Sequence, residues 1–207
     1  MMNAVYNRPV PADFVDYNES VFPAQIIHIG AAAAAFLLVL RPIGDSNRVV
    51  SMVLALLWLW TGIVYYIIFV SEIDPAAWLF GILFIVNAVL IFNDGVLNEH
   101  LKFDFSSNTA GIAGTFFVIF SLLIYPAIGF LIGREFPGNP TFAALCPITI
   151  YTIGMLMLTV SGVSLKLLWI PLVWSALLHY LWGYSKTFSS RSPVLLLKCL
   201  CFVLRGA

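Results

Sequence analysis

Long apolar runs separated by short polar connections dominate the order of side chains along this chain. The hydrocarbon core of a bilayer is about 30 Å thick, so a helix needs about 20 mostly apolar residues to cross it. Six stretches meet or approach that length: residues 25–40, 48–70, 75–92, 108–133, 141–160 and 166–184. This pattern predicts an all-α membrane protein, a bundle of transmembrane helices whose connections leave no room for a soluble domain.

The first 24 residues are the largest polar segment of the chain and precede the first apolar run. Phe14, Tyr17 and Val21 fall on one face of a helix, which predicts a short amphipathic helix lying on the membrane surface. The segment lacks the basic start and the small-residue cleavage site of a signal peptide. We therefore expect residues 1–24 to be kept as an N-terminal interfacial segment.

Residues 193–204, near the C-terminus, leave the number of spans open. They are apolar except for Lys198, and as a helix they reach only about 18 Å, which is short of a full crossing. They form either a short seventh span or a helix in the interface. In both cases residues 25–184 hold six spans, and residues 1–207 are expected to form one transmembrane domain.

The composition agrees with this interpretation and excludes several classes of protein. Of the 207 residues, 61% are hydrophobic and 10% are charged, against about 45–50% and about 25% in soluble domains. Ten basic and ten acidic residues give no net field for a nucleic-acid partner, and three cysteines give no disulfide framework. The expected partners are the lipid bilayer and either other membrane subunits or further copies of this chain.

Basic residues in the connections indicate an orientation that depends on the number of spans. With seven spans, one side of the membrane holds Arg41, Arg48, Lys102, Lys166 and Arg205, and the other holds Arg8, Arg134, Lys186 and Arg191. The positive-inside rule then places the N-terminus outside. With six spans the C-terminal basic residues change sides and the preference reverses.

Acidic residues are missing from the middle of every predicted span, although proton-coupled carriers usually need an intramembrane carboxylate. Nucleotide-binding, zinc-protease and nucleophile-elbow motifs are missing too. Asn87 is the one amide deep in the third span, and an interhelical hydrogen bond is its simplest role. We expect Asn87, Tyr125 and Thr149 to face the bundle interior, because an unpaired polar group in hydrocarbon costs several kcal/mol.

The dipeptide Cys146-Pro147 predicts a kink or an irregular start in the fifth span, because proline removes a backbone donor and crowds the preceding turn. Thr149 and Thr152 follow at helical spacing and provide partners for freed carbonyls. The polar stripe that results is a candidate pathway for a solute or a soft metal ion. The alternative is a kinked helix that buries a free cysteine.

His28, Cys146 and His179 are expected at one membrane level, because spans one and five start, and span six ends, on the same side. Two imidazoles and a thiolate are a plausible copper or zinc set. Nothing else in the sequence requires a cofactor. We expect the three side chains not to converge, each histidine being held instead by a neighbouring hydroxyl or backbone carbonyl.

Several short motifs occur in the order found in an uncharacterised family of bacterial multi-pass inner-membrane proteins, a domain-of-unknown-function family. They are Tyr17-Asn18-Glu19, Pro23-Ala24-Gln25, Leu56-Leu57-Trp58-Leu59-Trp60, Gly62, Tyr65, Asp74-Pro75-Ala76-Ala77, Phe80-Gly81, Pro140-Thr141-Phe142 and Cys146-Pro147-Ile148-Thr149-Ile150. The chain resembles this family over residues 14–175. The resemblance implies seven spans with the N-terminus outside and no known activity. The family pattern includes Cys146-Pro147 but neither His28 nor His179, which counts against the metal site.

Three functions from different classes fit these features. The first is a small-solute or ion transporter, or a channel-like protein, supported by the proline-broken fifth span and its polar stripe. The second is a non-catalytic accessory subunit of a larger membrane complex, supported by the missing carboxylate and the short connections. The third is a metal-dependent membrane enzyme or redox protein, so enzymatic activity is the least expected of the three.

Overall fold

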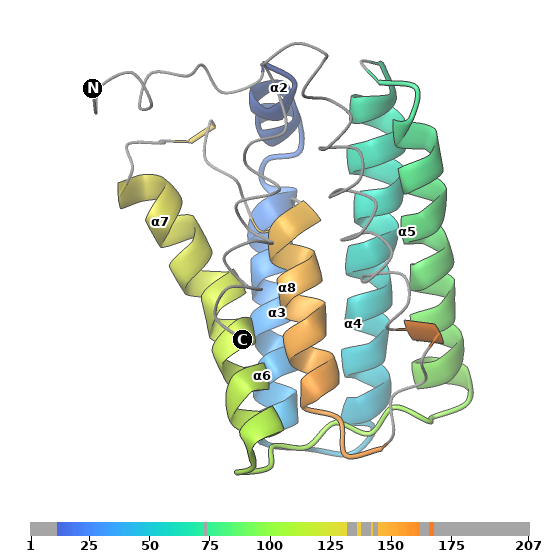
Figure 1. Cartoon of the computed structure of the whole chain (residues 1–207), viewed down its shortest axis with the longest axis vertical. Coiled ribbons are helices and arrows are strands. Elements are labelled where there is room, and N and C mark those ends of the chain that lie inside the picture. The colour runs from blue at the N-terminus through green and yellow to red at the C-terminus, as the bar shows by residue number, and fades with distance from the viewer. Residues whose placement is uncertain are drawn as a thin grey trace. The chain divides into compact units, whose positions relative to one another are not determined.

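The computed structural model in Figure 1 describes residues 12–72, 74–131, 136–137, 142, 145–161 and 166–167. The chain divides into two units, residues 1–163 and residues 164–207. Lys166 and Leu167 are the described residues of the second unit, and both are helical. All the elements below belong to the first unit.

The described part is all-helical, apart from an isolated antiparallel bridge between Phe103 and Thr159. Its α-helices are α2 (Ala12–Ser20), α3 (Ala24–Leu40), α4 (Ser46–Trp60), α5 (Ala77–Phe92), α6 (Thr109–Ile119), α7 (Tyr125–Leu131) and α8 (Leu145–Met157). Other helical segments extend or join them: the π-helices η1 (Thr61–Phe69), η3 (Asn93–Leu97) and η4 (Phe120–Ile124), and the 3-10 turn η2 (Val70–Glu72).

Three continuous helices are long and apolar enough to cross a membrane: Ser46–Glu72, Ala77–Leu97 and Thr109–Leu131. Shorter apolar helices cover Ala24–Leu40 and Pro147–Met157. Successive helices alternate in direction between an upper end, where α2 lies, and a lower end (Figure 1). The predicted fifth span, 141–160, contains α8, which ends at Met157 and is preceded by residues outside the described part. The sixth span beyond Leu167 and residues 193–204 lie outside the described residues.

Two pairs of helices approach each other through reciprocal glycine contacts. A Cβ built on Gly62 of η1, which continues α4, would lie 2.9 Å from the carbonyl oxygen of Gly81 in α5, and the reverse distance is 3.0 Å. Gly114 of α6 and Gly154 of α8 form the second pair, with distances of 2.7 and 2.8 Å. Such contacts allow backbones to approach closely where lipid provides no hydrophobic drive for helix association.

The N-terminal amphipathic helix exists as predicted, but its apolar face does not lie on lipid. Tyr17 and Val21 of α2 are buried against Trp60, Val64, Tyr65 and Phe69 of α4 and its π-helical extension. The Tyr17 ring meets the Tyr65 and Phe69 rings edge-on, at centroid distances of 5.1 and 5.3 Å. An apolar helix face can be buried against lipid or against other protein side chains. In this protein the aromatic side chains of α4 and η1 bury it. The side chain of Phe14 lies outside the described part.

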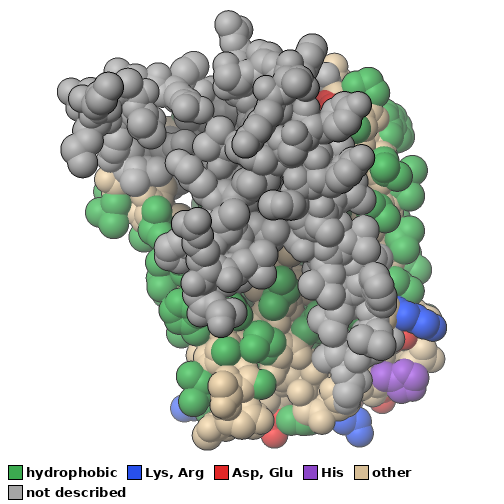
Figure 2. Space-filling view, in the orientation of Figure 1, with side chains coloured by type: hydrophobic (Ala, Val, Ile, Leu, Met, Phe, Trp, Pro, Cys, Tyr) green, Lys and Arg blue, Asp and Glu red, His purple; other side chains and the backbone are tan. Residues whose placement is uncertain are grey.

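Hydrophobic side chains cover the flanks of the described region, and charged and histidine side chains gather at its lower end (Figure 2). The most exposed apolar side chains include Ile27, Leu37, Leu123 and Leu131, each at least 62% exposed. Apolar surface of this extent is typical of a protein that contacts lipid or a partner.

Candidate functional site

The middle of the bundle holds a buried polar pair between α4 and α8. The indole Nε1 of Trp58 donates to Oγ1 of Thr152 at 2.8 Å, and the same hydroxyl donates to the carbonyl of Ile148 at 2.8 Å. The Trp58 ring stacks on Phe84 of α5, with centroids 4.5 Å apart. Trp58 and Thr152 are both fully buried. Thr152 is thus engaged in helix association, and its expected place on a pathway stays a prediction.

Asn87 of α5 lies at the same level and is fully buried. Two close contacts set the register of the antiparallel helices α4 and α5: Gly62 with Gly81, and Ser51 with Gly95. Asn87 lies between Gly81 and Gly95 at the height where Trp58 lies between Ser51 and Gly62. It is also the midpoint of the Ala77–Leu97 helix, about 15 Å along the axis from either end. An asparagine side chain is too short to reach either end of its helix from this depth.

Neither amide atom of Asn87, Oδ1 nor Nδ2, has a hydrogen-bond partner. The interhelical hydrogen bond that the sequence suggested for it is therefore missing from the described residues. Burying an amide without a compensating hydrogen bond costs roughly 1–3 kcal/mol by protein mutational data, and more on hydrocarbon scales. Among the described residues the hydroxyl of Thr115 in α6 is buried without a partner as well, but Asn87 is the side chain that leaves both a donor and an acceptor unpaired, which makes this level a candidate binding site.

Every charged side chain on the described apolar helices lies near a helix end. Arg48 is in the first turn of α4, Glu72 closes its extension, and Asp94 lies in the π-helical end of α5. On the described helices the middle level therefore carries neutral side chains.

A second polar cluster connects α2 to the upper end of α3. Asn18 donates from Nδ2 to the carbonyl of Pro137 at 2.6 Å, and Gln25 donates from Nε2 to Oδ1 of Asn18 at 2.9 Å. Trp60 donates from Nε1 to the hydroxyl of Tyr17 at 3.2 Å. Burial raises the pKa of Tyr17 to about 12, against a smaller lowering by the Trp60 hydrogen bond, so the phenol stays neutral at physiological pH. In the sequence, Asn18 and Gln25 stand out only within the family motifs, and periodicity does not predict that they pair.

His28 is held as the sequence predicted, by a backbone carbonyl. Its Nδ1 donates to the carbonyl of Ala24 at 2.6 Å, and its ring lies 4.7 Å from the Trp60 ring. The hydroxyl of Tyr151 donates to the carbonyl of Ala32 at 2.8 Å, joining α8 to α3, which runs in the same direction. That register places the backbone of residue 146 close to the level of His28.

A metal site built on His28, Cys146 and His179 stays a prediction. His179 and the side chain of Cys146 lie outside the described part, and the described residues hold no group of three His, Cys, Asp or Glu able to bind a metal ion. Copper or zinc therefore gains no support here.

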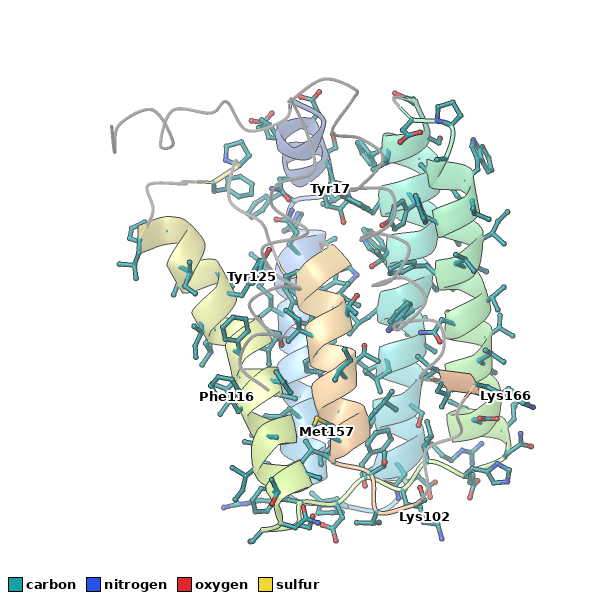
Figure 3. All side chains as sticks on the ribbon, in the orientation of Figure 1. Tyr17, Lys102, Phe116, Tyr125, Met157 and Lys166 are labelled. Carbon is teal, nitrogen blue, oxygen red and sulfur yellow. The ribbon has the colours of Figure 1, made fainter. Side chains whose placement is uncertain are left out.

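The kink expected at Pro147 also stays a prediction. Pro147 is the third residue of α8, and the carbonyl of Ala143, whose bond it would break, lies outside the described residues. Thr149 is buried as expected, while Tyr125 of α7 is half-buried and meets Phe120 edge-on at 6.4 Å (Figure 3).

Fold and contacts together define an all-helical protein over the described residues, with three membrane-length apolar helices and a mainly hydrophobic core that holds a few neutral polar side chains. The chain belongs to a family of unknown function (DUF6064), whose family model matches residues 12–193. This confirms the predicted membership of an unknown-function family, while the bacterial inner membrane stays a prediction. Neither the curated proteins nor the solved structures give a match to this chain.

Proposed function

We propose that the protein is a multi-pass integral protein of the bacterial inner membrane, with six or seven spans and the N-terminus outside. Three membrane-length helices and the exposed apolar side chains along them support the location. The bacterial source rests on the resemblance between the motifs of this chain and the family pattern.

Charges at the two ends support the orientation. Arg41, Arg48 and Lys102 lie at the lower end. The sequence between successive helices at the upper end holds Glu72 and Asp74 before α5 and one basic residue, Arg134, between α7 and α8. The positive-inside rule counts only Lys and Arg and makes the lower end cytoplasmic.

Single cysteines in a background without the three native ones test this orientation. In intact cells a membrane-impermeant maleimide is expected to label Asp74→Cys and to leave Asn98→Cys unlabelled until the cells are permeabilised. The opposite order of labelling would reverse the orientation.

For activity, we propose a small-solute or ion transporter, or a channel-like protein. The observation that carries this proposal is the buried Asn87, whose amide is unpaired at the middle of a membrane-length helix. Intramembrane polar residues are costly and commonly mark a path for solute or ion. The π-helical segments add support, because each of the three membrane-length helices contains one and such segments are frequent at functional sites.

Purified protein in proteoliposomes tests the activity. Solute entry is followed by light scattering and ion flux by enclosed dyes, with protein-free vesicles as the control. Faster passage of at least one solute or ion than in empty vesicles is expected. Permeability equal to that of empty vesicles for all of them would overturn the transport proposal.

A non-catalytic accessory subunit is the second candidate, favoured by the reciprocal contacts of Gly62 with Gly81 and of Gly114 with Gly154. Closely locked backbones suit a static support better than a moving pathway. Mild solubilisation distinguishes the two functions: stable co-purification of other membrane subunits, together with no flux in vesicles, would favour the accessory role.

A further inference from the structure

We propose that the Asn87 level binds small, planar, neutral solutes that carry both a hydrogen-bond donor and an acceptor, the chemical class of simple amides and urea. This inference rests on the proposed transport function and adds the class of substrate. It follows from the bonding capacity, the charge and the shape of the groups at this level.

The Asn87 amide has a donor and an acceptor that a solute could bond. The Asn87 side chain offers an NH₂ donor and a carbonyl acceptor next to each other, and both are buried and unpaired. A solute with an adjacent carbonyl and N–H satisfies the two together, in the paired geometry that amides adopt with one another. A solute with acceptors only, or donors only, leaves one atom of Asn87 unsatisfied.

Other polar groups near this level do not compete for the Asn87 amide. The Trp58 indole and the Thr152 hydroxyl bond each other and the carbonyl of Ile148. Thr61, the first residue of η1, donates to the carbonyl of Leu57. The hydroxyl of Thr115 in α6 is buried and unpaired as well, but it is a single atom, whereas the Asn87 amide offers a donor atom and an acceptor atom side by side to a solute.

The lack of a charged side chain next to Asn87 on α5 makes this level unfavourable for ions. The nearest charged residue along α5 is Asp94, seven residues away and about 10 Å along the axis. An ion at the Asn87 amide would lose its hydration without meeting an opposite charge, which is a far larger cost than burying a neutral amide.

Shape favours a planar solute. Phe84 lies one helical turn before Asn87 on the same buried face of α5, and its ring stacks on that of Trp58. A flat neutral molecule bonded to Asn87 would meet aromatic surface, as planar groups prefer.

Urea and acetamide are the probes, with potassium as the charged comparison. Proteoliposomes containing the full chain are mixed with each solute, and the relaxation of light scattering gives its permeability. Asn87→Leu removes both bonding atoms at nearly constant shape. Asn98→Leu is the matched control, because Asn98 is exposed at the lower end of the bundle and bonds only Asn93 there. Thermal unfolding and elution volume verify that both variants are folded.

We expect urea and acetamide to enter faster than in empty vesicles. Asn87→Leu should lower this excess about tenfold or more, since two hydrogen bonds are lost, and Asn98→Leu should leave it unchanged. Passage of potassium but not of urea would overturn this inference and leave the transport function standing. Unchanged urea entry through a folded Asn87→Leu protein would also overturn it, whereas no flux of any probe or ion would overturn both proposals.

Discussion

Replacing Asn87 with leucine should stabilise the protein, against the usual effect of changing a buried residue. Leucine has as many side-chain heavy atoms as asparagine and the same branching, so it fits the same space without a donor or an acceptor. The unpaired Asn87 amide costs roughly 1–3 kcal/mol of folding free energy. Asn87→Leu removes that cost and should raise the free energy of unfolding by about the same amount.

Thermal unfolding in detergent, followed by tryptophan fluorescence, measures this effect. For a chain of about 150–250 residues, 1 kcal/mol corresponds to roughly 2–4 °C in Tm, so we expect a rise of about 2–12 °C. Asn98→Leu changes an exposed asparagine and should stay within about 0.5 kcal/mol of the parent protein. A Tm for Asn87→Leu clearly below that of the parent would mean that the Asn87 amide is paired in the folded protein, and the reasoning would fail.

Three further substitutions test how the helices are held together, each by thermal unfolding. Gly114→Ala should destabilise by about 1–3 kcal/mol, because the new Cβ would lie 2.7 Å from the backbone carbonyl of Gly154. Gly30→Ala has no atom within 4 Å and should stabilise by about 0.5–1 kcal/mol through helix propensity, so equal effects at the two glycines would contradict the close helix contact. Thr152→Val should cost about 1–3 kcal/mol, because it leaves the buried Trp58 indole without its acceptor; an unchanged Tm would show that this hydrogen bond contributes nothing.

Helix positions were the most predictable part of the fold. The predicted span 48–70 matches Ser46–Glu72, and 108–133 matches Thr109–Leu131 as far as it is described. Apolar length alone fixes such elements, because backbone groups buried away from water must be satisfied within a helix. The π-helical segments were not predictable, since one extra residue per turn leaves no distinct side-chain pattern.

Contacts between helices were less predictable, for a different reason. Gly114 and Gly154 are forty residues apart, and nothing in their local sequence says that their backbones meet. The apolar pattern of α2 predicted a helix but not what would bury its apolar face, because lipid and aromatic side chains can both do so. Which polar side chains pair depends on neighbours that periodicity does not identify, so the sequence located Asn87 and could not show that its amide is free.

Trp58 and Asn87 are neutral polar side chains at the same level of the bundle, and they have opposite effects on stability. The Trp58 indole is bonded and strengthens the contact between α4 and α8, whereas the Asn87 amide is unbonded and weakens the fold. Binding sites commonly carry such a local cost, because groups kept free for a ligand are unsatisfied without it. Stability and permeability should therefore change in opposite directions in Asn87→Leu, with a higher Tm and slower urea entry in the same preparation. A variant that is more stable and equally permeable would make Asn87 an unsatisfied group without a role in transport.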